Sequence, residues 1–182
     1  MGIWSFNADY LIGSGNYLSS FPYLPLEEIL FFVCIPYSCI FTYFVFKRYF
    51  SENHFFKEFY DLIILSLIIL MFLTAVLNFR KMYTFYTSFL LFITLLYVKT
   101  KKINISLNIM AYLSIVPFFF LSNGVLTGSF IESAIVDYNP NHNLGIRMFT
   151  IPIEDIFYGF LLILWNGLLY DYIKSRRYLF AK

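Results

Sequence analysis

The chain has 182 residues, of which 60% are apolar or aromatic and only 13% are Asp, Glu, Lys or Arg, where soluble domains average about 25% charged residues. This composition excludes a water-soluble domain of this size and a disordered chain, and a formal net charge of +2 is too small for a nucleic-acid-binding protein. We therefore expect an all-α integral membrane protein whose surroundings are the lipid bilayer.

About five transmembrane helices are expected, because a span takes roughly 20 mostly apolar residues. Four charge-free runs cover residues 29–46, 62–79, 82–98 and 103–131, and the last of these is long enough for one helix plus an ordered flanking segment. The fifth run, 156–170, is short and must extend back towards Pro152 to span. Glu154 and Asp155 then lie near the hydrocarbon edge, where acids are costly and usually functional.

The basic residues predict the orientation of these spans. When the spans alternate, ten basic residues fall on one face and three on the other. The ten are Lys47, Arg48, Lys57, Lys99, Lys101, Lys102, Lys174, Arg176, Arg177 and Lys182, and the three are Arg80, Lys81 and Arg147. The positive-inside rule then places the N-terminus outside and the C-terminus in the cytoplasm of a cell-membrane protein.

An internal repeat is visible. Residues 25–31 (PLEEILF) recur as 152–158 (PIEDIFY), and residues 6–13 (FNADYLIG) as 138–145 (YNPNHNLG). Four crossings separate the copies, so they run parallel and both acid pairs open on the outer face. We expect one membrane domain over 1–182, with repeat one over 4–46 and repeat two over 82–173. Two spans precede the second motif and none precedes the first, which predicts that two N-terminal helices are missing.

The acid pairs, Glu27 with Glu28 and Glu154 with Asp155, have two interpretations. Pro25 and Pro152 with acids in the following turn form an ordinary helix start, where carboxylates face the positive end of the dipole. Alternatively, each pair supplies an acid and a base for chemistry at the membrane edge. Two matching copies favour this second interpretation. Neighbouring helix residues point about 100° apart, so one member of each pair should face the reaction centre.

Five further residues accompany the acids. Arg147 is expected either to pair with Glu154 or Asp155 or to act as an interfacial cation. Asn7 and Asn139 match across the repeats, and either form turns or orient an acid. The rings of Phe31 and Phe32, beside the first pair, could stabilise a passing cation.

Other familiar motifs are absent from the sequence. Gly13-Ser14-Gly15 is not followed by the rest of a dinucleotide-binding fingerprint, and there is no Walker A motif. The two histidines and two cysteines have no metal-ligand spacing. No aspartate-rich pair suitable for holding a magnesium diphosphate is present, since Asp61, Asp137 and Asp171 each stand alone in the sequence, which argues against a membrane prenyltransferase. We therefore predict no cofactor and no metal.

The stretches at 25–32 and 145–155 resemble motifs of the membrane-type, flavin-independent lycopene cyclase domain. The resemblance to this family covers essentially the whole chain. The resemblance implies an isomerase (intramolecular lyase) that converts lycopene to β-carotene through γ-carotene with no net redox change. Its acidic motif carries over onto Pro25, Glu27, Glu28, Pro152, Glu154 and Asp155. The resemblance implies that lycopene, dissolved in the membrane, is the substrate. It also suggests that the chain assembles with further copies of itself or with a second cyclase subunit.

Fused members of that family have about seven spans, so the resemblance also predicts that two spans are missing here. Another polypeptide supplies them, or this chain is a shortened version of a longer gene product. Three alternatives to a β-cyclase stay open: a cyclase of another carotenoid or ring type, a non-catalytic membrane carrier or subunit, and a truncated inactive copy.

Overall fold

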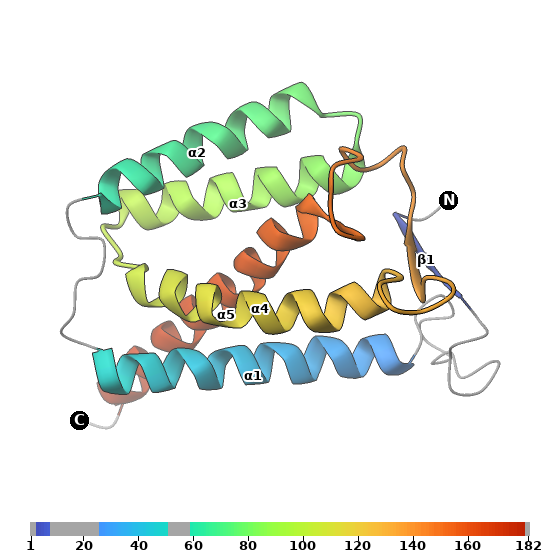
Figure 1. Cartoon of the computed structure of the whole chain (residues 1–182). Helices are drawn as coiled ribbons and strands as arrows, with labels where there is room; N and C mark the ends of the chain where they lie inside the picture. The colour runs from blue at the N-terminus through green and yellow to red at the C-terminus, as the bar shows by residue number, and fades with distance from the viewer. Residues whose placement is uncertain (1–2, 8–25, 51–58, 181–182) are drawn as a thin grey trace.

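Five long helices make up most of the structure, a computed structural model that describes residues 3–7, 26–50 and 59–180, with side chains over 3–7, 28–50 and 59–175 (Figure 1). They are α1 (Leu26–Phe50), α2 (Tyr60–Leu77), α3 (Met82–Thr100), α4 (Ser106–Leu126) and α5 (Ile153–Phe180). Each is long and apolar enough to cross a membrane, and a helix satisfies its own backbone hydrogen bonds there. The predicted all-α, multi-pass membrane fold is confirmed.

Helix α1 continues past the end of its charge-free run. Lys47 and Arg48 lie in its last turn, where cations suit the helix dipole.

Helix α5 begins at Ile153, so the expected extension of the fifth span towards Pro152 is confirmed. The fourth run was expected to hold one helix plus an ordered flanking segment, and this is confirmed, since α4 ends at Leu126. The chain then turns at Gly128, whose φ of +103° favours glycine.

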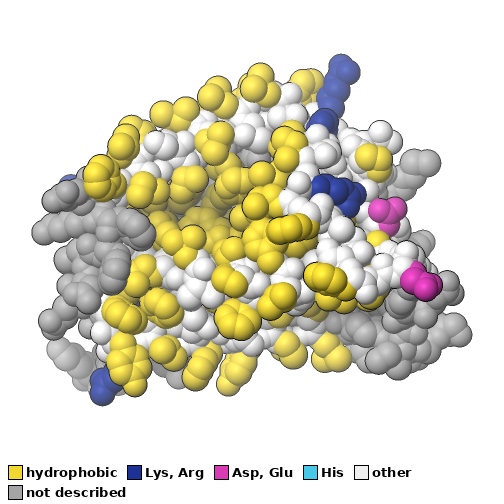
Figure 2. Space-filling model, viewed as in Figure 1, with side chains coloured by type: hydrophobic (Ala, Val, Ile, Leu, Met, Phe, Trp, Pro, Cys, Tyr) yellow, Lys and Arg dark blue, Asp and Glu magenta, His cyan; other side chains and the backbone are white. Residues whose placement is uncertain are grey.

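Helix α2 packs along α3, and α5 contacts α1, α3 and α4. The core between them is built from buried aliphatic side chains such as Ile64, Met71, Leu91, Leu95 and Leu164. Apolar side chains cover the middle of the face in Figure 2, and the coloured acidic and basic side chains lie towards its ends. This distribution is typical of a protein whose middle is surrounded by lipid.

Four short strands lie at one end of the bundle or in the loop before α5: β1 (Trp4–Phe6), β2 (Val136–Tyr138), β3 (Arg147–Met148) and β4 (Ile151–Pro152). Strand β1 pairs antiparallel with β2, and β3 pairs with β4. Helices α1 and α5 both start at the end that carries β1 and run in the same direction (Figure 1). The two acid motifs therefore start at the same end, as predicted.

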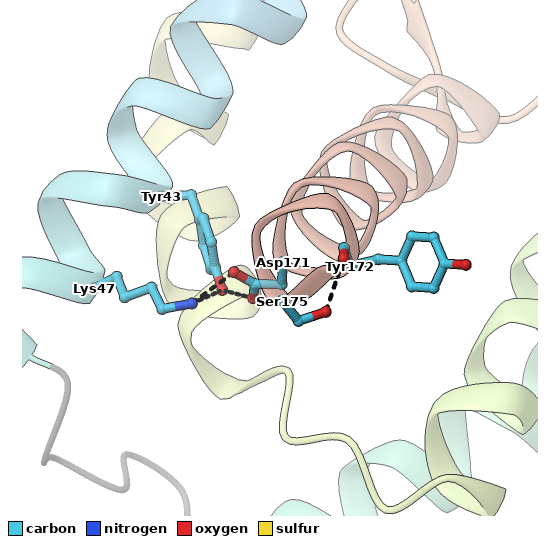
Figure 3. Close-up of polar contacts among 5 residues, drawn as sticks. All are labelled: Tyr43, Lys47, Asp171, Tyr172 and Ser175. Carbon is cyan, nitrogen blue, oxygen red and sulfur yellow. Dashed lines mark hydrogen bonds and ion pairs between the residues drawn. The ribbon is translucent and has the colours of Figure 1, made fainter. Parts of the chain in front are cut away.

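At the opposite end, Asp171 of α5 joins α5 to α1 (Figure 3). Its Oδ1 lies 2.6 Å from Lys47 Nζ, and its Oδ2 accepts a 2.7 Å hydrogen bond from the Tyr43 hydroxyl. Asp61 lies 3.2 Å from Lys99 Nζ. Separate helices therefore bring a lysine to each of these two aspartates.

Asp171→Asn is expected to lower the melting temperature of the detergent-solubilised protein by about 2–4 °C, the shift that about 1 kcal/mol produces in a chain of this size. The effect is small because both side chains of the ion pair are 39% exposed, and exposed pairs contribute at most about 1 kcal/mol. Glu132→Gln, at an exposed position, is the control. A melting temperature unchanged in Asp171→Asn would show that this contact does not hold α1 to α5.

Candidate active site

Asp155, in the first turn of α5, is buried with 4% of its surface exposed and accepts hydrogen bonds from three elements. Its Oδ1 accepts from the Tyr83 hydroxyl of α3. Its Oδ2 accepts from Asn123 Nδ2 of α4 at 2.7 Å and from the Tyr138 hydroxyl of β2 at 2.7 Å. Donors of this kind replace the water that a buried carboxylate loses.

Asp155 lines a cavity of about 70 Å³ together with Glu28 of α1. These two acids occupy the same position in their motifs, the third residue after Pro25 and after Pro152. Most of the other lining residues are aromatic: Trp4, Phe31, Phe32, Tyr83, Phe119, Tyr138 and Tyr158. The structure therefore brings one acid from each motif into one aromatic cavity, which we call the acid pocket.

Glu154 is also buried, but it is not among the residues that line the acid pocket. Its Oε1 accepts a 2.6 Å hydrogen bond from Thr84 Oγ1 and a 2.7 Å bond from the Leu144 backbone N–H. These bonds connect the start of α5 to the start of α3 and to the loop before β3. In this geometry Glu154 positions the loop and the helix start, next to the residue that faces the cavity.

The loop that reaches Glu154 is shaped by asparagines. The Asn139 Oδ1 accepts from the Asn141 N–H at 3.0 Å, and the Asn143 Oδ1 accepts from the Gly145 N–H at 2.8 Å. Gly145 has φ +77°, a left-handed conformation that favours glycine. These are turn-forming bonds, so of the two roles considered for Asn139 the structure shows turn formation.

Several predicted site residues lie elsewhere. The Arg147 guanidinium donates to the Thr150 carbonyl at 2.8 Å and is exposed. Of the two roles considered for Arg147, the structure does not show pairing with Glu154 or Asp155, whose hydrogen-bond partners among the described residues are tyrosine, threonine, asparagine and backbone donors. Asn7 donates to Ser133 Oγ at 3.3 Å, next to the β1–β2 pair. Pro152 is buried in β4, directly before α5. Pro25 and the side chain of Glu27 lie outside the described residues.

The hydrogen-bond donors to the acids were not predicted. Tyr83 and Thr84 open α3, Asn123 lies in the last turn of α4 and Tyr138 ends β2. One signal was available in the sequence: Asn123 is an amide inside a charge-free apolar run, and polar groups at membrane depth usually face a partner or a cavity. The tyrosines gave no such signal, because they are common throughout the chain.

Tyr138 lies outside the membrane-spanning segments, and its environment keeps it protonated. Burial raises the pKa of its hydroxyl far above the usual value, and the neighbouring Asp155 carboxylate raises it further. Its ring also stacks on Tyr83, with 5.8 Å between ring centroids. Tyr138 therefore remains a hydrogen-bond donor to Asp155 beyond about pH 10, where a free tyrosine ionises.

Tyr138→Phe should lower turnover about 10- to 100-fold while leaving the protein folded, because it removes one bond to a charged group, worth about 1.5–3 kcal/mol, and keeps the stacked ring. The loss should be the same at neutral and mildly alkaline pH, since Tyr138 does not ionise in that range. The measurement is conversion of lycopene, the substrate that the sequence resemblance implies, against pH in lipid vesicles. Tyr86→Phe, at an exposed tyrosine of α3, is the matched control, and equal activity of both variants would contradict this role.

This arrangement can give and take a proton inside an apolar, aromatic cavity. Two carboxyl groups supply an acid and a base, and ring faces stabilise positive charge between them. In the part of the chain that the structure describes, no three His, Cys, Asp or Glu side chains are grouped to hold a metal ion.

The fold and the acid pocket define a multi-pass membrane protein with paired carboxyl groups at one end of its helices. A family model described as lycopene cyclase matches residues 1–46 and 80–173, most of the chain, and leaves out residues 47–79, which include α2. The chain therefore belongs to the lycopene cyclase family. Membership supports a carotenoid cyclase-type role, with a carotenoid as substrate and lipid around the helices. Neither the curated proteins nor the solved structures contain a match to the chain.

Proposed function

We propose that this protein is a lycopene β-cyclase, an intramolecular lyase that converts the linear ψ ends of lycopene to β-rings, by way of γ-carotene to β-carotene. The observation that carries the proposal is the meeting of Glu28 and Asp155, from two matched motifs, in one aromatic cavity. A hydrocarbon substrate suits a site between apolar helices, because it reaches the site through the bilayer.

The proposed reaction begins when a protonated carboxyl group adds its proton to the terminal alkene of a ψ end. The resulting tertiary cation is attacked by the next alkene, and the new carbon–carbon bond closes a six-membered ring. The positive charge moves onto the ring, and a carboxylate removes a proton from the adjacent ring carbon. One proton is gained and one is lost, so the product is an isomer and the reaction needs no electron donor.

We assign the base to Asp155 and the acid to Glu28. Asp155 accepts hydrogen bonds on both oxygens, and donors on both oxygens stabilise the carboxylate form. Glu28 faces the same cavity, and none of the described residues donates a hydrogen bond to it. A carboxyl group that accepts no hydrogen bond from these residues is better suited to hold a proton until an alkene arrives.

The acid pocket is proposed to open near the outer face of the membrane. Lys47, Lys99 and Lys174 lie in the last turns of their spans, at the end of the bundle away from the pocket. The positive-inside rule assigns that end to the cytoplasm. The N-terminus then lies outside and the C-terminus inside.

Expression of the chain in a lycopene-accumulating bacterium, followed by pigment chromatography, tests the function. We expect γ-carotene and β-carotene to appear at the expense of lycopene. A product with the ring double bond elsewhere would replace the β-cyclase with a cyclase of another ring type. Unchanged lycopene with the protein inserted in the membrane would overturn the proposal and favour a carrier or an inactive copy.

A further inference from the structure

A second, larger cavity adjoins the acid pocket. Its volume is about 250 Å³, against about 70 Å³ for the acid pocket, and it lies between α1, α4 and α5. The two cavities share Phe31, Phe119 and Tyr158 in their linings. An occupant of the larger cavity, which we call the side cavity, would therefore extend past these three rings to Glu28 and Asp155.

Four hydroxyl groups in the lining of the side cavity are bonded to backbone carbonyls. The hydroxyls of Ser38, Thr42 and Ser122 donate to the carbonyl four residues earlier on their own helices, at 3.0, 3.1 and 3.0 Å. The Tyr112 hydroxyl donates to the Ile156 carbonyl. These donors are not directed at an occupant, and a ligand that needs polar partners would lose its hydration without compensation. The lining therefore suits a hydrocarbon.

The side cavity also meets the lipid-facing surface. Ser38 of α1 and Ser122 and Phe118 of α4 line it and are exposed, with Phe118 71% exposed. Serines on both facing helices leave the seam between α1 and α4 lined partly by small side chains. A molecule dissolved in the bilayer can reach the cavity sideways through this seam, without passing through water.

We propose that the side cavity binds the polyene arm of the carotenoid, which enters between α1 and α4 and directs one linear end past Tyr158 into the acid pocket. This inference rests on the proposed function and adds the path and the binding site of the unreacted arm. Cys39 and Gly159 set the width of the cavity. Cys39 is 4% exposed, and a Cβ at Gly159 would lie 3.7 Å from Tyr112 and 3.9 Å from Phe119.

The test compares Cys39→Phe with Cys34→Phe, the same substitution five residues earlier on α1 at an exposed position. Each is combined with Asp155→Asn, so that bound lycopene is converted at most in traces, and the full chain is purified from lycopene-accumulating cells. The readout is the absorbance of bound lycopene per protein. Cys34→Phe should retain the pigment, and Cys39→Phe should lose at least 90% of it. Gly159→Leu, which fills the cavity from α5, should reproduce the loss.

A monodisperse size-exclusion profile shows that each variant is folded, and Cys39→Ala, which enlarges the cavity, should keep the pigment. Equal pigment in Cys39→Phe, Gly159→Leu and Cys34→Phe would overturn the side-cavity proposal. Failure of the proposed function looks different. In that case the chain without Asp155→Asn leaves lycopene unconverted, whether or not the pigment remains bound and sensitive to Cys39→Phe.

Discussion

Asp155→Asn is expected to reduce β-ring formation by about 10²- to 10⁴-fold, the usual contribution of a general acid or base. Asparagine keeps the size of the side chain and accepts a hydrogen bond, and the tyrosine hydroxyls can rotate to accept from its amide. What is lost is the ability to remove a proton from the cyclised cation. The cation should then lose a proton from another carbon or take up water, giving traces of rings with a different double bond or a hydroxyl group.

Pigment chromatography with mass spectrometry on lycopene-accumulating cells measures this outcome. Glu132→Gln is the control for a carboxyl group that is exposed and outside the acid pocket. Undiminished β-carotene in Asp155→Asn, with the protein present at the level of the parent chain, would remove Asp155 from the reaction.

Glu28→Gln is expected to have an effect of similar size and a different product pattern. The glutamine amide cannot protonate an alkene, so no cation forms and lycopene should remain unchanged, without the misplaced double bonds expected for Asp155→Asn. The two variants therefore distinguish the acid from the base within one cavity. Chromatography of the same cells makes the comparison, with insertion checked by membrane fractionation.

If Glu28→Gln gave the misplaced rings and Asp155→Asn gave unchanged lycopene, the two roles would be exchanged. Full cyclisation in Glu28→Gln would exclude Glu28 as the acid. Glu154→Gln offers a comparison within the second motif. Its amide oxygen can still accept from Thr84 and Leu144, and its side chain does not line the acid pocket.

The spans could be predicted from the sequence because each helix must match the bilayer by itself. Charge-free runs locate α2 and α3 closely, since no tertiary contact is needed to make a helix in lipid. The end of α1 was less closely located, because this helix continues through Lys47 and Arg48 to Phe50, beyond its charge-free run. The end of the fourth run is the flanking segment that turns at Gly128 after α4 ends at Leu126.

The acids of the site could be predicted because they recur in a repeated motif, but their surroundings could not. The donors to Asp155 lie 72, 32 and 17 residues away in the chain, at Tyr83, Asn123 and Tyr138. Which helices become neighbours is a property of packing that one sequence does not state. Arg147 shows the same limit, since its closeness in sequence to the acids left two roles open, and its guanidinium donates to the Thr150 carbonyl.

The most direct test of redox-neutral lycopene cyclisation by this protein is a reconstitution with purified components. The full chain is placed in lipid vesicles containing lycopene, with no flavin or nicotinamide added, and the pigments are separated after incubation. We expect β-carotene, with the same mass as lycopene, to be formed by the parent chain and not by the Asp155→Asn variant. Unconverted lycopene with the parent chain, or conversion that depends on an added reductant, would contradict this expectation.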